Sequence, residues 1–543
     1  MPRLRGKKIK KEKKTMKKLL ALLMAMIMLC SVIAIASAEE EDAEWITLRV
    51  EAYDRDIPGF NVEDCMQLHY AQENFGDPNH IKIQFVSTGR WTEGEQLTQW
   101  LAGGTAPDIC LTYNGDLVNQ MIDEGGIWQL DDLLAEYGQD LVAFLGKDSL
   151  LPFGQKNGIQ WFIPARRLNV GDVGNFIRAD WLKALNMEKP TTVAEFTEFL
   201  RAAKAANLGG EKTVPMHIDL YEANPLYNIA RFTDAFLDFT QITEEDWYAY
   251  ANLHELLPGS KEAYRWLNTL YNEGLVYENF YLDNATEQDS FLVNGYFGYF
   301  TMQPDQPWRT DKNYETELEK NVEGASWTSV NCFENASLGG KHLHSVYAAN
   351  GLSIIIPKTT DEATAIAAIK YMNWMAGPEA MFFMQNGIEG INYLEVTEDG
   401  IPTNVQSNDA VPDENKMHAG DICFISNGLF YGSDEMNAKG IALSFPAEYR
   451  DEVALSYADC NVDAWTQNSF TVAIKASTDY GAEVSNKEAK FLTDVVTCAP
   501  DAFDATFDAA IADIIAAGAD KIVEEQRAAY QAGNVRGTFP GND

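Results

Sequence analysis

Basic residues are scarce in this chain of 543 residues, which has 42 Lys+Arg against 81 Asp+Glu and a formal net charge of -39. This excess of negative charge would repel the phosphate backbone of a nucleic acid and an anionic membrane surface. We therefore expect no nucleic-acid partner. Hydrophobic residues make up 46% of the chain, which is ordinary for a globular protein and excludes a disordered or fibrous one.

The sequence also lacks the local motifs of several enzyme classes. It has no GxSxG nucleophile elbow and no P-loop, and His254 to Pro258 fails the HExxH zinc pattern at its last position. His342 and His344 would share one face of a strand, but no third metal ligand stands at a recognisable spacing. We therefore expect no catalysis, no metal site and no cofactor. Many hydrolases also lack local motifs, so an exported polysaccharide-degrading enzyme remains the alternative.

Cysteine is infrequent and never forms a CxxC pair. Cys30 lies in an N-terminal apolar run, and the six that follow it are Cys65, Cys110, Cys332, Cys423, Cys460 and Cys498. An even number would allow disulfides in an exported protein. Their wide spacing and the length of the chain favour buried free thiols instead.

Long apolar runs are absent except near the N-terminus. A basic segment up to Lys18 precedes an apolar run over residues 19–35, and a small-residue site ends at Ala38. This order predicts a secretory signal over residues 1–38, cleaved after Ala38, with an uncleaved membrane anchor as the alternative. Leu29 precedes Cys30, whereas a lipidated cysteine usually follows a small residue, so the sequence does not favour lipid anchoring. We expect a protein exported across the cytoplasmic membrane, to the periplasm or the cell surface.

The first part of the mature chain alternates strands and helices. Apolar and polar residues alternate over 45–52 and 80–86, and a short apolar run at 107–111 predicts a third strand. Helices are expected over 61–75 and 93–102 between these strands, and this order predicts an α/β lobe with a parallel sheet. Further helices are expected over 193–206, 261–273 and 362–375, and over 502–530 with a break at Gly518.

Six segments, taken in chain order, form a recognisable set of motifs. They are 101–109 (LAGGTAPDI), 176–182 (FIRADWL), 189–196 (KPTTVAEF), 271–276 (YNEGLV), 371–374 (YMNW) and 386–390 (NGIEG). These segments are similar to motifs of the extracellular solute-binding proteins of family 1, in its long lipoprotein-like branch, and the first resembles the "LASG-x-x-PDI" turn of that family. The likeness extends from about Trp45 to Tyr530.

The resemblance implies a periplasmic-binding-protein type II fold, which is α/β with two discontinuous lobes joined by a multi-strand hinge. The expected N-terminal lobe comprises residues 39–165 plus 335–390, and the expected C-terminal lobe 166–334 plus 391–543. It also implies a monomer that binds a carbohydrate, often an oligosaccharide, and delivers it to the permease subunits of an ABC transporter; a non-sugar polar solute is the other possibility. Many relatives carry a calcium loop where this chain has residues 207–212 (NLGGEK), with a single carboxylate.

Candidate ligand-binding residues combine aromatic rings, which pack on sugar faces, with planar polar groups that match hydroxyls. Three pairs follow predicted parallel strands, where ligands bind in open α/β sheets. We also expect three further residues to contact the ligand. Asp305 and Trp308 follow an aromatic segment, and Tyr393 lies just past the expected hinge at residues 389–390. An acidic sugar is a possible ligand of Arg166 and Arg167, but a solvated or salt-bridged pair is favoured. The three pairs are Tyr53 and Asp54, Arg90 and Trp91, and Tyr113 and Asn114.

Overall fold

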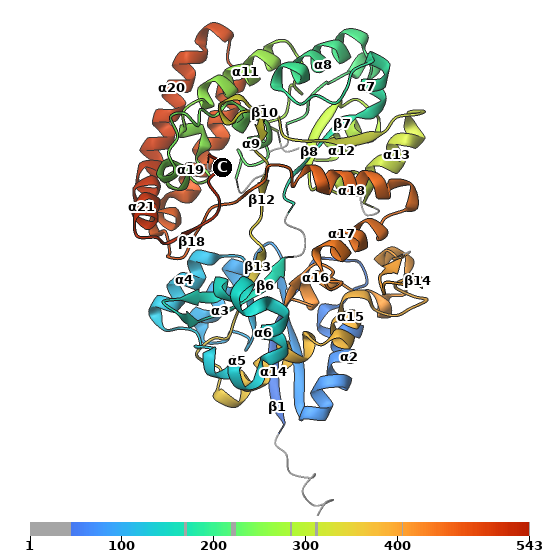
Figure 1. The fold of residues 1–543 in the computed structure, drawn as a ribbon, viewed down its shortest axis with the longest axis vertical. Coiled ribbons are helices and arrows are strands. Elements are labelled where there is room, and N and C mark those ends of the chain that lie inside the picture. The colour runs from blue at the N-terminus through green and yellow to red at the C-terminus, as the bar shows by residue number, and fades with distance from the viewer. Residues whose placement is uncertain are drawn as a thin grey trace, which may run out of the picture.

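A computed structural model describes residues 45–167, 171–218, 224–282, 285–309, 313–403 and 405–541. The predicted signal segment and Cys30 lie outside these residues. The chain forms two α/β lobes, one above the other in Figure 1, so the expected fold class is confirmed. Within the described ranges, no helix is both long and apolar enough to cross a membrane.

A largely parallel sheet forms the centre of the N-terminal lobe. β1 (Ile46–Asp54) pairs in parallel with β2 (Ile81–Gly89), and a parallel bridge joins β1 to the segment that leads into β3 (Cys110–Thr112). β13 (Asn350–Ile355) runs antiparallel to both β3 and β6 (Ile163–Arg167), and β16 (Ser426–Asn427) pairs in parallel with β6. Strands β1, β2, β3 and β6 therefore all end at the same edge of the sheet.

Helices cover this sheet and bury its apolar side chains. The predicted alternation of β1 and β2 is present, since Leu48, Val50, Ile81, Ile83 and Phe85 are buried in one core cluster. The helices of this lobe are α2 (Met66–Ala71), α3 (Glu93–Gly103), α4 (Gly115–Glu124), α5 (Asp131–Tyr137), α6 (Gln139–Leu145), α14 (Glu362–Met375), α15 (Pro378–Asn386) and α16 (Ala419–Ile422). The short hairpins β4 (Gln155–Lys156) with β5 (Ile159–Gln160) and β14 (Glu395–Val396) with β15 (Pro402–Thr403) complete it.

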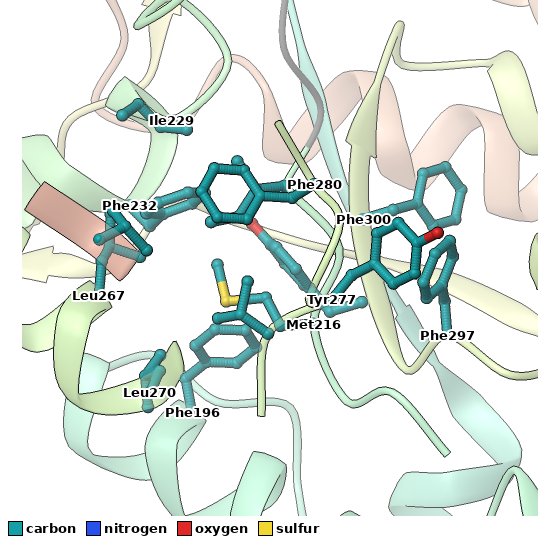
Figure 2. Packing of buried hydrophobic residues seen from close by; sticks show 14 of the residues in the cluster. Phe196, Met216, Ile229, Phe232, Leu267, Leu270, Tyr277, Phe280, Phe297 and Phe300 are labelled. Carbon is teal, nitrogen blue, oxygen red and sulfur yellow. The ribbon is translucent and has the colours of Figure 1, made fainter. Parts of the chain in front are cut away.

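The C-terminal lobe has a smaller antiparallel sheet, in which β7 (Gly174–Arg178) lies between β8 (Tyr299–Met302) and β9 (Trp327–Val330). Aromatic and aliphatic side chains from several helices converge beside this sheet, including Phe196, Phe232, Leu267 and Phe300 (Figure 2). The helices up to β9 are α7 (Ala179–Leu185), α8 (Val193–Ala206), α9 (Ala230–Thr233), α10 (Glu244–Ala249), α11 (Ser260–Asn272), α12 (Ala285–Val293) and α13 (Tyr314–Asn321).

The C-terminal part of the chain packs on the same lobe as α18 (Arg450–Asp459), α19 (Lys475–Thr497), α20 (Phe503–Ile514) and α21 (Asp520–Gln531). The predicted break at Gly518 is confirmed, because this residue has φ 117° between α20 and α21. A Cβ atom there would approach the ring of Tyr480 to 2.5 Å, so glycine is required for both its backbone angle and the close contact. Short strands β17 (Trp465–Thr466), β18 (Ser469–Phe470) and β19 (Val535–Arg536) connect these helices to the rest of the lobe.

The chain crosses between the lobes after β6 and before β7, again between β12 (Ser345–Val346) and β13, and a third time through α17 (Asp434–Leu443). The contacts displace two of the expected boundaries. Leu343 packs with Trp247 and Trp465 in the C-terminal lobe, because β12 pairs with β17, whereas the sequence placed residue 335 onward in the other lobe. Residues 422–425 belong to the N-terminal core, although residue 391 onward was expected in the C-terminal lobe. We infer lobes of 45–167 plus 350–427, and 171–346 plus 450–541.

The six described cysteines are free thiols, as the sequence favoured. Five are buried, and Cys498 is half-buried. His344 lies in the same interior, with its Nδ1 3.4 Å from the sulfur of Cys332. Burial lowers the pKa of His344 to about 3, so this histidine is neutral and belongs to the packing of the lobe.

Candidate functional site

The carboxyl edge of the N-terminal sheet brings together the six residues predicted to follow its strands. In the register of β1 and β2, Tyr53 lies opposite Thr88 and Asp54 opposite Gly89, so the next two residues, Arg90 and Trp91, leave the sheet beside the end of β1. Tyr113 and Asn114 follow β3 at the same edge. The principle that parallel strands end together therefore placed these side chains correctly relative to one another.

Arg90 is the centre of this group. Its guanidinium carbon lies 4.2 Å from the ring centroid of Tyr113, 5.1 Å from that of Trp91 and 5.3 Å from that of Tyr53. We call these four residues the aromatic shelf. Tyr53 is buried, Tyr113 is half-buried, and Trp91 is 79% exposed. The shelf thus presents one large free ring beside a cation that three rings hold in place.

Ion pairs and buried polar groups support the aromatic shelf. Arg55 donates to both carboxylate oxygens of the buried Asp421, at 2.5 and 2.9 Å, and its guanidinium lies 6.0 Å from the Trp91 ring. The hydroxyl of Tyr53 is buried with no hydrogen-bond partner among the described residues, and burial raises its pKa. The Asn114 side chain accepts from the backbone N–H of Leu117 and so caps α4. The shelf is therefore fixed by its own lobe before any ligand arrives.

A second cluster of polar side chains lies in the C-terminal lobe and was not predicted. Asp172 is buried and accepts hydrogen bonds from Tyr227 at 2.6 Å, Arg231 at 2.6 Å, Gln467 at 2.7 Å and Ser345 at 2.9 Å. Each donor is far from Asp172 in sequence, so no local sequence pattern predicts the cluster. A buried ion pair of this kind holds side chains in fixed orientations, because breaking it leaves an uncompensated charge.

These donors line a cavity of about 60 Å³, together with Trp465 and Asn468. Several polar atoms of its walls are buried with no hydrogen-bond partner in the described part of the chain: the indole N–H of Trp465, the amide oxygen of Asn468 and Nε of Arg231. Unpaired buried polar groups cost about 1–3 kcal/mol each, and a hydroxylated ligand could satisfy them. The cavity is thus suited to a polar guest.

Tyr347 connects this cavity to the N-terminal lobe. Its hydroxyl interacts with Asp172 and Tyr227, and burial raises its pKa to about 12. The guanidinium of Arg167, at the end of β6, lies 4.0 Å from the Tyr347 ring centroid. Since β6 ends at the same edge as β1, β2 and β3, the cavity and the sheet edge that carries the aromatic shelf meet at the hinge.

Three predicted site residues lie elsewhere. Trp308 is only 2% exposed and packs edge-on against Phe176, because the short helix η9 (Gln306–Trp308) turns its ring into the core. Asp305 is paired with Arg309 at 2.7 Å. Tyr393 is buried in the N-terminal lobe, edge-on to Phe382. The structure therefore does not bring these residues to the aromatic shelf or the cavity.

Direct contacts also join the lobes away from the hinge. Arg536 donates to the backbone carbonyls of Phe153 at 2.9 Å and Pro152 at 3.0 Å, and its guanidinium lies over the Phe153 ring. The backbone N–H of Ile474 donates to Asp116 at 3.2 Å. These hydrogen bonds connect the two lobes on the side of α4 and β18 (Figure 1).

Over the residues that the structure describes, no group of three or more His, Cys, Asp or Glu side chains could hold an ion. His342, which the sequence paired with His344, instead directs its Nδ1 to the backbone carbonyl of Cys332. The chemistry available at the hinge is therefore hydrogen bonding, charge and aromatic contact.

Solved structures with the same fold include several sugar-binding proteins. A solute-binding protein described as HMO-binding, from Bifidobacterium longum infantis ATCC 15697, has a TM-score of 0.65 and 15% identity and covers 91% of this chain and 100% of its own. The alginate-binding protein AlgQ2 has a TM-score of 0.57 and 16% identity, with 90% and 100% covered. FusA of S. pneumoniae, in complex with kestose, has a TM-score of 0.56 and 14% identity, with the same coverage.

Sequence comparison extends this likeness to the family level. Lipoprotein LipO of Bacillus subtilis (strain 168) is 24% identical over 351 residues, which cover 60% of this chain and 64% of LipO, so the match spans less than two thirds of that relative. The model of the bacterial extracellular solute-binding proteins matches residues 70–409. The members of this family and the structural neighbours are binding proteins and not enzymes, which confirms the interpretation of the missing catalytic motifs. The chain therefore belongs to the family of bacterial extracellular solute-binding proteins.

Proposed function

We propose that this protein binds a carbohydrate, specifically an oligosaccharide, between the aromatic shelf and the C-terminal cavity. It then delivers this ligand to the permease of an ABC importer. The observation that carries the proposal is the free ring of Trp91, 79% exposed and held beside Arg90 at the carboxyl edge of the sheet. An exposed aromatic face offers contact to the C–H face of a sugar ring, while the cavity offers unpaired hydrogen-bonding groups to its hydroxyls.

The relatives support a sugar rather than another solute. The structures that share this fold are described as binding HMO, alginate and kestose, which are all carbohydrates. The chain crosses between lobes three times, so the lobes can rotate about short hinge segments. A ligand that contacts both lobes favours their closure by its differential contacts, and the closed form then docks on the permease as a monomer.

Titration calorimetry of the purified protein against a panel of oligosaccharides tests the proposal. We expect binding to at least one member, with no hydrolysis product detected by chromatography after prolonged incubation. Trp91→Ala should weaken that binding by roughly 2–13-fold through the lost aromatic contact, which is worth about 0.5–1.5 kcal/mol, and further through the apolar area that is no longer buried.

Trp45→Ala is the matched control. Trp45 is 52% exposed and directly precedes β1, so it lies at the opposite end of the strand from the aromatic shelf. Its replacement should leave the affinity unchanged. Equal effects of the two substitutions would remove the shelf from the binding site, and binding of a peptide or another polar solute with no response to any saccharide would replace the carbohydrate assignment.

A further inference from the structure

Two arginines at the proposed binding site are unusual in this acidic protein. Other arginines pair with carboxylates, as Arg55 does with Asp421 and Arg201 with Glu273, or donate to backbone carbonyls, as Arg536 does to Phe153. Arg90 and Arg167 have no ion pair and no side-chain hydrogen bond to any residue that the structure describes, and Nε of each is buried without an acceptor. The chain has 81 acidic residues, so the lack of an ion pair to either guanidinium within the described part of the chain is a specific feature.

Aromatic rings hold both guanidinium groups in place. Arg90 lies against the rings of the aromatic shelf, at 4.2 Å from the Tyr113 centroid, and Arg167 lies 4.0 Å from the Tyr347 centroid. A ring face attracts the cation, but it accepts no hydrogen bond from the N–H groups, which point outward in the guanidinium plane. Each arginine is therefore oriented while its hydrogen-bonding capacity stays available.

Both arginines stand at the same edge of the N-terminal sheet. β13 is antiparallel to β6 and to β3, and β3 is joined in parallel to β1, so β6 ends on the same side as β1 and β2. The order β6–β13–β3–β1–β2 separates the strand ends that carry Arg167 and Arg90 by four strand spacings, which is on the order of 20 Å. One elongated ligand lying along this edge could reach both.

The charge around Arg90 favours a singly charged group over a phosphate. Asp54 and Glu93 lie on the neighbouring strand end and at the start of α3, and Asp421 is already neutralised by Arg55. A dianion would meet repulsion from these carboxylates. A single carboxylate matches one planar guanidinium, which binds it through two parallel N–H···O bonds.

We infer that the solute is an acidic oligosaccharide, a chain containing uronic acid residues, with one carboxylate bound by Arg90 and a second by Arg167. This inference rests on the proposed function and specifies its ligand class. The exposed ring of Trp91 would pack on the sugar that carries the first carboxylate, and the C-terminal cavity would receive hydroxyls from the opposite side.

Calorimetry with paired probes tests the inference. The probes are size-matched oligogalacturonates and oligomannuronates, the same chains with their carboxyl groups reduced to alcohols, and a sulfated oligosaccharide series. We expect an acidic chain to bind more tightly than its reduced counterpart. Arg90→Gln should weaken binding of the acidic chain by roughly 10–150-fold, the range expected for hydrogen bonds to a charged group, and should leave the reduced chain nearly unaffected. Arg167→Gln should act in the same direction.

Two further variants separate ligand binding from structural effects. Arg201→Gln removes an arginine that is 53% exposed and paired on another part of the surface, and should change no affinity. Arg90→Lys keeps the cation beside the rings but loses the planar fork, so it should give an intermediate affinity for the acid even if Arg90→Gln fails to fold.

The outcomes distinguish this inference from the function on which it rests. Equal affinity for the acidic and reduced chains, equal weakening of both by Arg90→Gln, or binding of the sulfated series alone would overturn the inference while leaving a carbohydrate-binding protein. Failure of every saccharide to bind would overturn the proposed function as well.

Discussion

Glu51 lies beneath the aromatic shelf and links the stability of the protein to pH. Its side chain is fully buried on β1, one carboxylate oxygen accepts from the backbone N–H of Leu111 at 2.7 Å, and the other has no partner among the described residues. Burial raises the pKa of Glu51 from 4.5 to about 8, and the nearby Glu93 adds to the effect. The carboxyl group is therefore neutral in the folded protein near pH 7.

The direction of the pH dependence follows from this raised pKa. Between the unfolded value of 4.5 and the folded value of about 8, the folded state holds a proton that the unfolded state has released. The contribution of Glu51 to the free energy of unfolding has its full value below pH 4.5. Between pH 4.5 and about 8 this contribution falls by about 1.4 kcal/mol per pH unit, or roughly 5 kcal/mol in all. Above about pH 8 no further loss is expected from this group.

Glu51→Gln should remove this dependence, because glutamine has the shape of the protonated acid and does not titrate. Urea unfolding at about pH 5, 6, 7 and 8 measures the free energy of unfolding of both proteins. The free energy of unfolding of the variant should rise relative to that of the wild type by about 1.4 kcal/mol for each pH unit. The unpaired amide adds a constant offset and does not change the slope. Glu188→Gln, at an exposed position, is the control; parallel pH profiles for wild type and Glu51→Gln would refute the reasoning.

Three other substitutions give distinct expected results. Trp308→Ala should lower the free energy of unfolding by about 3–5 kcal/mol, because the ring is 2% exposed in the core, and a urea titration showing no loss would place the ring outside it. Asp172→Asn leaves the buried Arg231 without its counter-charge and should cost about 3–5 kcal/mol, again by urea unfolding; a change under about 1 kcal/mol would contradict the pairing. Arg536→Ala removes two bonds between the lobes and should increase the radius of gyration in small-angle scattering, whereas Arg201→Ala should not.

The part of the candidate site that the sequence predicted is the part that depends on strand periodicity. β1 and β2 alternate buried and exposed residues, and the positions just after parallel strands meet in space, so Arg90, Trp91 and Tyr113 could be placed together. The Asp172 cluster could not be found this way, because its bonds to Arg231 and Gln467 join residues 59 and 295 positions apart.

The direction in which a side chain points was the other feature that the sequence could not predict. Trp308 follows an aromatic strand and looked available for stacking, but its ring faces Phe176 because η9 turns inward after Asp305. Nothing in the local pattern distinguishes an inward from an outward ring at such a turn. The lobe boundaries depended in the same way on distant pairing, since β16, which precedes the third crossing, pairs with β6 much earlier in the chain.

The interleaving of the two lobes determines when each can be completed during synthesis. The sheet that begins at Ile46 takes its last strand from Ser426–Asn427, and the helices that cover the other lobe extend to Gln531. The N-terminal lobe therefore cannot close its interior until Asn427 has been synthesised, and the C-terminal lobe cannot do so until the chain is almost complete. Pairings this remote in sequence slow folding, so the nascent polypeptide stays open for longer than one made of consecutive domains. If the chain is exported as its N-terminal segment predicts, this delay would keep it open during its passage across the membrane.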